Sequence, residues 1–335
     1  MVAFVDLPCQ LAERVELLYS MHHTLLIYNP VAGRYPSRIL TERAARVFQQ
    51  YGWGVEIETT LDGSHIPILA RQAVQENLDS IIIVGGDGSI NKALPGLVGT
   101  ETALGVLPAG TSNVWAQELG LPGLSLTRWS ALEESAHRLA RGSIQSVDVG
   151  LCNDKYFLLW AGVGLDAFIV HRIEPRKQWQ KNFTIVRYAA DVVWSASRWS
   201  GINLRVITND HIMEGQFMLA EVSNIRLYAG GLATLSPQAV LDDGLMDLWL
   251  FDGTSLEHIL QQVWSLWSGQ HVNSDRVQCL PFQKIRMESD SPIYIQMDGE
   301  PEIGGEQVTI EVLPRLLKVL IPDQASKSLL HNATN

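Results

Sequence analysis

The sequence predicts an α/β class for the first part of the chain, as a doubly wound sheet, and an all-β class for the second, as a β-sandwich. In the first part, apolar strand-like runs alternate with amphipathic helix-like segments, which is typical of doubly wound sheets. In the second part, short alternating strands dominate, as in β-sandwiches. A length of 335 residues suits two domains. We expect an N-terminal extension at 1–22, an α/β domain at 23–142, a β-sandwich domain at 143–322 and a disordered tail at 323–335.

The elements of the α/β domain follow from apolar periodicity. We expect strands at 24–28, 55–59, 81–84 and 103–107, and helices at 37–51, at 66–75 and between 113 and 120. One face of the first helix is apolar: Leu40, Ala44, Val47, Phe48 and Tyr51. Ligands of doubly wound sheets bind at the carboxyl ends of the strands. We therefore expect the polar loops at 29–34, 85–91 and 110–113 to converge there.

The pattern changes near Gly142, so the domain boundary is expected at 141–146. Strands of the second domain are expected at 156–160, 204–208, 216–222, 246–251, 285–287, 293–297, 308–312 and 316–321. Helices are expected at 183–199 and 256–267. An active site in such a chain would lie between the two domains.

Composition excludes several classes of protein. The net charge is -11 and the pI is about 5.3, whereas a nucleic-acid-binding protein usually has a basic surface. No apolar run reaches the roughly 18 residues that span a bilayer, and the start of the chain does not resemble a signal peptide. Three widely spaced cysteines fit a reducing compartment. We therefore expect a cytoplasmic protein that does not bind nucleic acid.

The run from Ile81 to Asn91 is the most informative segment. A buried β-branched strand is followed by Gly85, Gly86, Asp87, Gly88 and Ser89. Glycines let backbone N–H groups approach an anion closely, and a following helix N-terminus adds partial positive charge. The loop is neither a Walker A motif nor a dinucleotide fingerprint. The alternative is an ordinary strand-to-loop turn. Asp87 has no evident structural task there, which suggests a metal or a proton to handle.

Seven motifs in order resemble those of the diacylglycerol kinase catalytic-domain family, which includes bacterial lipid kinases and sphingosine and ceramide kinases. The motifs are Asn29-Pro30-x-x-Gly33-Arg34, Gly85-Gly86-Asp87-Gly88-Ser89-x-Asn91, Pro108-x-Gly110-Thr111-x-Asn113, Asp148-x-Gly150, Gly162-x-Gly164-x-Asp166-Ala167, Gly230-Gly231 with Pro237-x-Ala239-x-x-Asp242-Asp243-Gly244-x-x-Asp247, and Asp298-Gly299-Glu300. Together they cover residues 24–322.

The resemblance implies a Rossmann-like first domain and transfer of a phosphoryl group from ATP to a lipid hydroxyl, with Mg²⁺. The implied nucleotide-binding residues are Asn29, Gly33, Thr60, Gly85, Gly86, Asp87, Gly88, Ser89, Asn91, Gly110 and Thr111. Thr60 has an alternative role in capping the end of its strand.

By the same resemblance, Glu300 is the first candidate for the general base, and Asp298 is its partner. Paired acids are costly to bury unless they bind a metal or share a proton. An exposed Asp-Gly hairpin turn is the alternative for this segment. Asp87 competes for the role of base, but we assign it first to metal or phosphate binding.

Asp243 matches a position that holds a structural divalent ion in bacterial relatives. The ion would also contact the backbone carbonyls of Val240 and Leu245, and a site of oxygen ligands suits Mg²⁺ or Ca²⁺. A plain Asp-Gly turn is the alternative.

A lipid kinase must meet a membrane, so we expect a peripherally membrane-associated protein with a lipid substrate at the membrane surface. Residues 171–181 are the densest basic stretch and precede the expected helix with Tyr188 and Trp194. An apolar stripe within 7–19 is an alternative contact. The oligomeric state stays open, with a homodimer as one alternative.

Lys92 departs from the family pattern, which has a glutamate there. It reverses a charge beside the glycine loop. A catalytically silent protein that binds lipid or nucleotide is therefore one alternative. An NAD kinase-like or phosphofructokinase-like enzyme is another, because such enzymes share the Gly-Gly-Asp-Gly loop.

Overall fold

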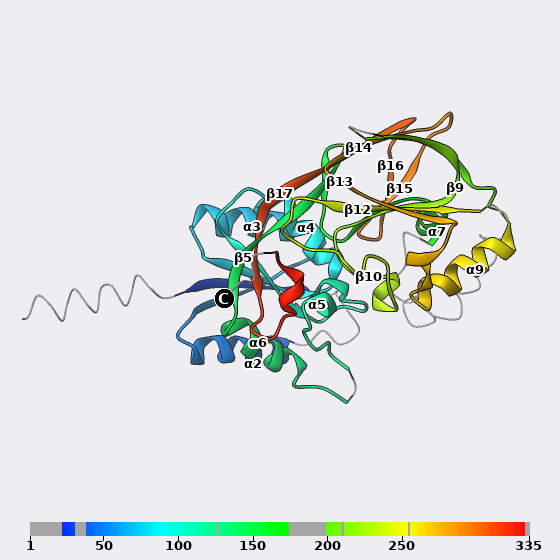
Figure 1. Ribbon diagram of the computed structural model, residues 1–335. Coiled ribbons are helices and arrows are strands. Elements are labelled where there is room, and N and C mark those ends of the chain that lie inside the picture. The colour runs from blue at the N-terminus through cyan, green and yellow to red at the C-terminus, as the bar shows by residue number, and fades with distance from the viewer. Residues whose placement is uncertain are drawn as a thin grey trace, which may run out of the picture.

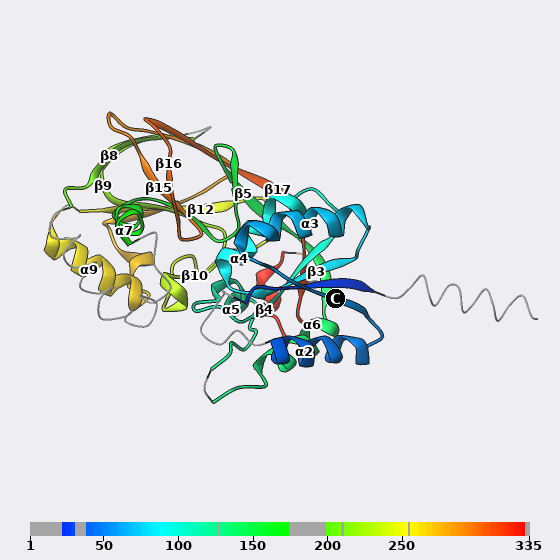
Figure 2. The ribbon, with the colours of Figure 1, turned by 180° about the vertical axis from the view of Figure 1, so that it is seen from behind.

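The computed structural model describes residues 22–30, 38–125, 127–173, 199–208, 211–253 and 255–331. They form two lobes (Figure 1). In the first lobe, four parallel strands stand in the order β2-β1-β3-β4. Figure 2 shows α3 and α4 on one face of this sheet and α2 and α6 on the other. The lobe therefore has the doubly wound architecture that the sequence predicts.

The elements of the first lobe match those that the sequence predicts, except that helix α6 was not predicted. Its strands are β1 (His23–Tyr28), β2 (Gly54–Thr59), β3 (Ser80–Gly85) and β4 (Ala103–Pro108), and its helices are α2 (Arg38–Gln50), α3 (Ile66–Gln75), α4 (Asp87–Leu97), α5 (Val114–Glu118) and α6 (Ala131–Ala140), with the short turn η1 (Gly63–His65). β3 is buried on both faces because helices cover both sides of the sheet. The predicted apolar face of this helix wrongly includes Tyr51, because α2 ends at Gln50 and Tyr51 is 40% exposed.

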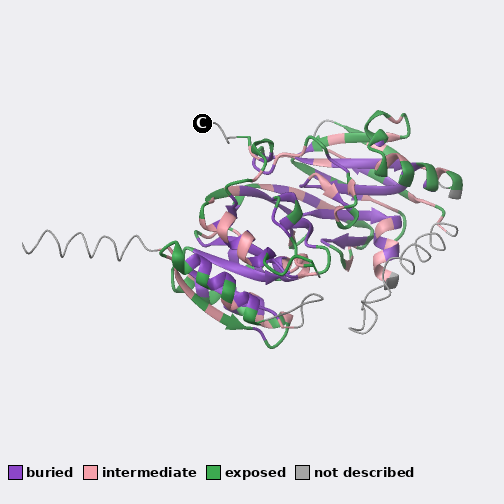
Figure 3. Ribbon diagram, turned by 90° about the horizontal axis from the view of Figure 1, so that it is seen from below, coloured by how far each residue is buried: buried purple, intermediate pink, exposed green. Residues whose placement is uncertain are grey.

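The second lobe is almost entirely β-structure around its own core. Its strands are β5 (Ser143–Cys152), β6 (Lys155–Phe157), β7 (Trp160–Gly164), β8 (Ile202–Ile207), β9 (Ile212–Ser223), β10 (Leu227–Tyr228), β11 (Ala233–Thr234), β12 (Met246–Asp252), β13 (Val277–Phe282), β14 (Lys284–Glu288), β15 (Tyr294–Met297), β16 (Glu300–Ile303) and β17 (Gln307–Ile321). Its helices are α7 (Leu165–Ile173) and α9 (Leu256–Trp267), with the short turns η3 (Ala229–Gly231), η4 (Gln270–Asn273) and η5 (Lys327–Leu329). Figure 3 shows buried residues concentrated in the strands of both lobes.

One strand joins the lobes. The sequence suggests separate strands at 308–312 and 316–321, but the structure has the single 15-residue strand β17. It pairs with β14 in the second lobe and with β4 in the first, and it runs antiparallel to β5. Its register against β5 shifts between Leu313 and Leu317, where Arg315 has a φ of +52°. The interrupted alternation in the sequence therefore marks an irregularity inside one strand.

The predicted disorder after residue 322 is wrong for residues 323–331. These residues form an ordered segment that contacts both lobes: the N–H of Asp323 donates to the carbonyl of Arg138, and the fully buried Leu329 accepts the N–H of Leu241. Few apolar residues are enough here because each has a place in an existing core. The extension at 1–21 and the expected helix at 183–199, except Trp199, lie outside the described residues. Among the described residues, no helix is long and apolar enough to cross a membrane.

Candidate active site

Two glycine loops meet at the carboxyl ends of β3 and β4. A Cβ added to Gly110 would lie 2.5 Å from the Cα of Gly86, so the two backbones touch and only glycine fits. The N–H groups of Ala109 and Gly110 donate to the carbonyl of Gly85, at 3.0 and 3.1 Å. These contacts bring the loops at 85–91 and 110–113 together, as the fold class predicts.

Asn113 fixes the shape of the second loop. Its φ of +53° places it in the left-handed region, which asparagine tolerates better than most residues. Its Oδ1 accepts the N–H of Gly110 at 2.7 Å, and its Nδ2 donates to the Gly110 carbonyl at 3.0 Å. Thr111 and Ser112 are thereby held at an exposed loop tip. The hydroxyl of Thr111 is therefore available to a ligand.

Asp87 has a structural task that the sequence does not reveal. Its two carboxylate oxygens accept the N–H groups of Val114 at 2.9 Å and Trp115 at 3.0 Å, which begin α5. The carboxylate thus caps α5 and ties the two glycine loops together. Burial raises the pKa of Asp87, and the two backbone donors act in the opposite direction.

The start of α4 offers an anion-binding geometry. Gly86 precedes the helix in an extended conformation, and the N–H groups of Ser89 and Ile90 bond back to its carbonyl at 2.9 and 3.2 Å. Ser89 is buried, close to Gly85. The positive end of the helix therefore faces the space beyond Gly86 and Gly88.

Asp298 and Gly299 form the two-residue turn between β15 and β16. Their φ values are +49° and +85°, as a type I′ hairpin turn requires. The sequence offers an exposed Asp-Gly hairpin turn as one alternative for this segment. The hairpin turn is present, but Asp298 is buried in it. Asp298 accepts four hydrogen bonds, from the N–H groups of Leu158, Leu159 and Trp160 and from the Nδ2 of Asn91, all at 2.8–3.0 Å. Burial raises the pKa of Asp298 and these donors lower it. Asp298 therefore acts as an anchor for the turn.

Glu300 is exposed and faces the glycine loop. A Cβ added to Gly88 would lie 3.6 Å from the Oε1 of Glu300. The anchored turn thus carries a carboxylate from the second lobe to the first residues of α4. Gly88 and Glu300, which are far apart in the sequence, therefore lie close together in the structure.

Two family models match the two parts of the chain. Residues 23–152 match the diacylglycerol kinase catalytic domain, and residues 160–321 match the YegS C-terminal NAD kinase beta sandwich-like domain. The chain is a diacylglycerol kinase catalytic domain followed by a YegS-type domain. This confirms the resemblance that the motifs carry and the fold class.

The similar proteins carry the names of lipid kinases. A "Diacylglycerol kinase" of Bacillus subtilis is 25% identical, with 92% of this chain and 99% of that protein covered. A "Probable lipid kinase YegS-like" of Chromohalobacter salexigens is 29% identical, with 83% and 86% covered. A crystal structure of a putative diacylglycerol kinase from Bacillus anthracis has the same fold, with a TM-score of 0.74, 19% identity, and 92% and 99% covered. The chain is therefore similar, over most of its length, to proteins named as lipid kinases.

Two other predicted residues of the kinase catalytic domain have clear places, and a third is not described. Thr60 is buried at the end of β2, where its N–H donates to the carbonyl of Tyr28 at 2.9 Å and its hydroxyl lies 3.4 Å from the same atom. This is the strand-capping role. Asn29 is buried at the end of β1, near the glycine loops in the sheet order. Gly33 lies outside the described residues.

Lys92 lies beside Gly63, away from the hydrogen bond between Asn91 and Asp298 that anchors the turn. Its ammonium group contacts the backbone of Gly63, in the segment that follows β2. Asn91, the residue before it, is the one that bonds Asp298. The reversed charge therefore leaves the anchoring contacts in place and adds a cation beside the strand ends.

The predicted ion position lies in a cluster of acids in the YegS-type domain. Asp243 is exposed, and its Oδ1 accepts the N–H of Leu245 at 3.0 Å. The nearby Asp148 is fully buried and accepts the N–H groups of Gly244 at 2.7 Å and Arg315 at 2.8 Å. Burial, with added repulsion from Asp243 and Asp242, raises the pKa of Asp148 to about 6.

These carboxylates fit a cation chemically, because a positive ion would relieve their repulsion. Within the described residues, no three His, Cys, Asp or Glu side chains are grouped so as to hold a metal ion. A site there would need backbone carbonyls, as predicted for Val240 and Leu245. The ion site stays a prediction.

A buried ion pair between the two domains was missed by sequence reasoning. The side chain of Glu118, at the end of α5, is fully buried and accepts from the Nε of Arg226 at 2.6 Å and the N–H of Leu227 at 3.0 Å. It joins the kinase domain to Arg226 and to the first residue of β10. Single charged residues without a motif give no signal of such pairing.

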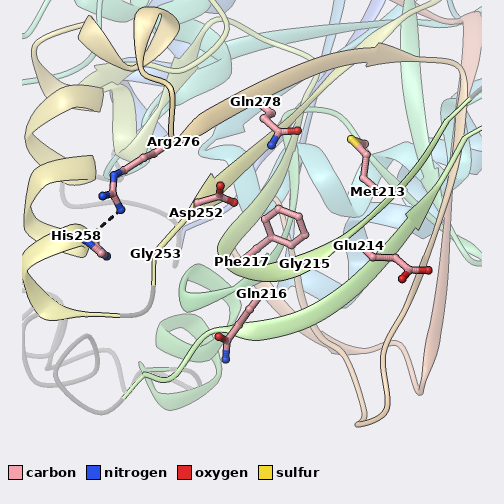
Figure 4. Close-up of a pocket in the computed structure, with 10 residues that line it drawn as sticks. All are labelled: Met213, Glu214, Gly215, Gln216, Phe217, Asp252, Gly253, His258, Arg276 and Gln278. Carbon is pink, nitrogen blue, oxygen red and sulfur yellow. Dashed lines mark hydrogen bonds between the residues drawn. The ribbon is translucent and has the colours of Figure 1, made fainter.

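A surface hollow of about 570 Å³ lies elsewhere, beside β9, β12, β13 and the start of α9 (Figure 4). Its lining is mixed: Met213, Glu214, Gly215, Gln216, Phe217, Asp252, Gly253, His258, Arg276 and Gln278. None of these is a predicted site residue. The candidate active site is therefore the junction of the glycine loops and the Asp298–Glu300 turn.

Proposed function

We propose that this protein is an ATP-dependent lipid kinase that transfers the γ-phosphoryl group to a lipid hydroxyl, with a diacylglycerol-like or sphingoid-like acceptor. The observation that carries the proposal is the position of Glu300 opposite Gly88, at the N-terminus of α4. A carboxylate that can accept a proton thus faces a site built for phosphate.

The first lobe would bind the nucleotide phosphates. The backbone of 85–88 and the N-terminus of α4 offer donors and positive potential, and Thr111 offers a hydroxyl. Phosphoryl transfer depends mainly on such positioning and charge stabilisation. Asp87 supports the cradle by holding the start of α5 against it.

The second lobe would supply the side chain that accepts the proton of the lipid hydroxyl. Glu300 accepts the proton of the lipid hydroxyl, while Asp298 keeps the turn in place through its four donors. Mg²⁺, when bound with ATP, would neutralise charge on the phosphates. Carboxylates suit this ion, and Glu300 and Asp87 both lie at the glycine loop that begins α4.

The test is transfer of label from γ-labelled ATP to a panel of lipids in vesicles, separated by chromatography. We expect labelled product with at least one glycerolipid or sphingoid acceptor, and loss of product with Glu300→Gln. Transfer to NAD instead would support the NAD kinase-like alternative. ATP binding without transfer to any acceptor would support the alternative of a catalytically silent protein. The charge of Lys92 would then be the first cause of inactivity to test.

A further inference from the structure

Helix α9 buries one polar side chain and exposes four large apolar ones. Gln262 is only 3% exposed, and it is held by contacts with Ser265. In contrast, four large apolar side chains of the helix are 49–64% exposed: Leu260, Val263, Trp264 and Trp267. A surface helix normally buries its apolar side and exposes its polar side. The exposed side of α9 therefore has the character of a contact surface.

This surface carries no charge over a long stretch. Residues 260–273 include no Asp, Glu, Lys or Arg, although 18% of the chain is charged. The rings of Trp264 and Trp267 lie side by side, with centroids 5.3 Å apart, and Val272 in η4 adds a side chain that is 45% exposed. Tryptophan is enriched where protein meets the boundary of lipid headgroups and acyl chains.

A short path connects this surface to the candidate active site. α9 contacts β11, and Leu232, just before β11, is 76% exposed. The turn η3, directly before Leu232, rests on the tip of the 110–113 loop: a Cβ on Gly230 would lie 3.8 Å from the Oγ of Ser112. Figure 1 shows β10 between α5 and α9. The helix that carries the apolar surface is therefore linked, through β11 and η3, to the tip of the 110–113 loop.

We propose that the exposed side of α9, formed by Leu260, Val263, Trp264 and Trp267, docks on the lipid bilayer. The inference rests on the proposed function, because a lipid acceptor is presented by a bilayer. The helix would lie in the interface plane, with the two tryptophans in the headgroup boundary. An uncharged surface with exposed indole rings suits the boundary between lipid headgroups and acyl chains. It suits contact with a second copy of this acidic chain less well.

The experiment measures sedimentation of the full chain with neutral phosphatidylcholine vesicles. We expect Trp264→Ala/Trp267→Ala to weaken vesicle binding at least tenfold. The matched control is Ile39→Ala/Ile68→Ala, which removes two exposed apolar side chains from the first lobe and should bind like wild type. Because the surface is uncharged, high salt should not weaken binding.

A second measurement separates this inference from the proposed function. Turnover of a lipid in vesicles should fall in the tryptophan variant, while turnover of a short-chain lipid in detergent should stay near wild type. If wild type phosphorylates no lipid but binds vesicles through the two tryptophans, the proposed function fails and the docking surface stands.

Three results would overturn the docking surface. One is equal vesicle binding by wild type and the tryptophan variant. Another is a change in oligomeric state of the variant by light scattering, which would assign the surface to a second copy of the chain. The third is a large fall in its melting temperature relative to the control, which would assign the surface to packing within the chain.

Discussion

The side-chain amide of Asn91 donates a hydrogen bond to the carboxylate of Asp298, with 2.9 Å between Nδ2 and Oδ2. The two residues are 207 positions apart and belong to different lobes. Asn91 lies on α4, one turn after Gly88, and Asp298 begins the turn that carries Glu300. This bond therefore sets the position of the proposed base relative to the phosphate loop.

We expect Asn91→Ala to lower kcat by roughly 10- to 100-fold with little change in the KM for ATP. Asp298 keeps its three backbone donors, so the fold should lose only about 1–2 kcal/mol. Steady-state kinetics test this, with Asn203→Ala on the exposed face of β8 as the control. A rise in KM for ATP at constant kcat would show that Asn91 binds nucleotide instead.

Glu300→Gln should reduce lipid-dependent turnover by about 10²- to 10⁴-fold, the usual contribution of a general base. Gln keeps the shape of the side chain but cannot take the proton. ATP affinity by calorimetry should stay the same, because the proposed phosphate site lies in the first lobe. If Glu300→Gln turns over normally while Asp87→Asn is inactive, Asp87 is the base.

Asp87→Asn should lower both activity and stability. An asparagine has one acceptor oxygen, whereas Asp87 accepts two N–H groups at the start of α5. One donor would face an amide NH₂, so we expect a loss of about 1–3 kcal/mol in the free energy of unfolding. Denaturant unfolding measures it, and an unchanged midpoint would contradict the cap. The sequence alone suggests that this variant keeps its stability.

The buried acids of the second lobe should make stability depend on pH. Glu221 is fully buried and Asp166 is partly buried, and Tyr228 and Gln296 bond to them. Burial raises the pKa of Asp166 to about 6, and burial with the charge of Asp166 raises the pKa of Glu221 well above its usual value. The native state therefore holds protons that the unfolded chain releases near pH 4, so stability falls as pH rises through about 6 and beyond.

Glu221→Gln should remove part of this loss. Gln cannot ionise, and its carbonyl oxygen can still accept from the Nε2 of Gln296, which is 2.9 Å from Glu221. We expect a melting temperature a few degrees above wild type at pH 8 and little difference at pH 4.5. The exposed Glu257→Gln should show no such pH-dependent gain. An equal effect of Glu221→Gln at both pH values would point to packing rather than to ionisation.

Asp243→Asn tests the predicted ion site. It preserves the acceptor for the N–H of Leu245 and removes one charge from the acidic cluster. We expect Mg²⁺ to raise the melting temperature of wild type, and the variant to lose most of this gain. The control is Asp290→Asn, in an exposed turn. Equal stabilisation of all three proteins by the ion would reject the site.

The sequence was most informative where local pattern and burial agree. The apolar run 81–84 predicts β3 because β-branched residues buried on both faces suit a central parallel strand. The motifs also identify the residues that meet at the lobe junction. Strands β5, β7, β13 and β16 and the two-residue strands β10 and β11 were missed. Glycines in Trp160–Gly164 and the shortness of Glu300–Ile303 weaken the patterns of β7 and β16.

Roles that depend on long-range contacts could not be read from the sequence. Asp87 and Asp298 look like ligands in isolation, yet their oxygens accept backbone donors from α5 and from 158–160. Those donors come from segments whose placement only the folded chain defines. The exposed side of α9 is similar, since periodicity predicts its helix but not which side faces outward.

The single strand β17 has a consequence for how this protein is made. During synthesis, the first lobe leaves the ribosome long before residues 307–321, which pair with β4 and β5 and add Leu317, Val319 and Leu320 to its core. Until then β4 has an open edge, and unpaired edges invite association with other chains. The nascent kinase domain would therefore need protection until translation is nearly complete, and a chain stopped before residue 314 should aggregate rather than fold as half an enzyme.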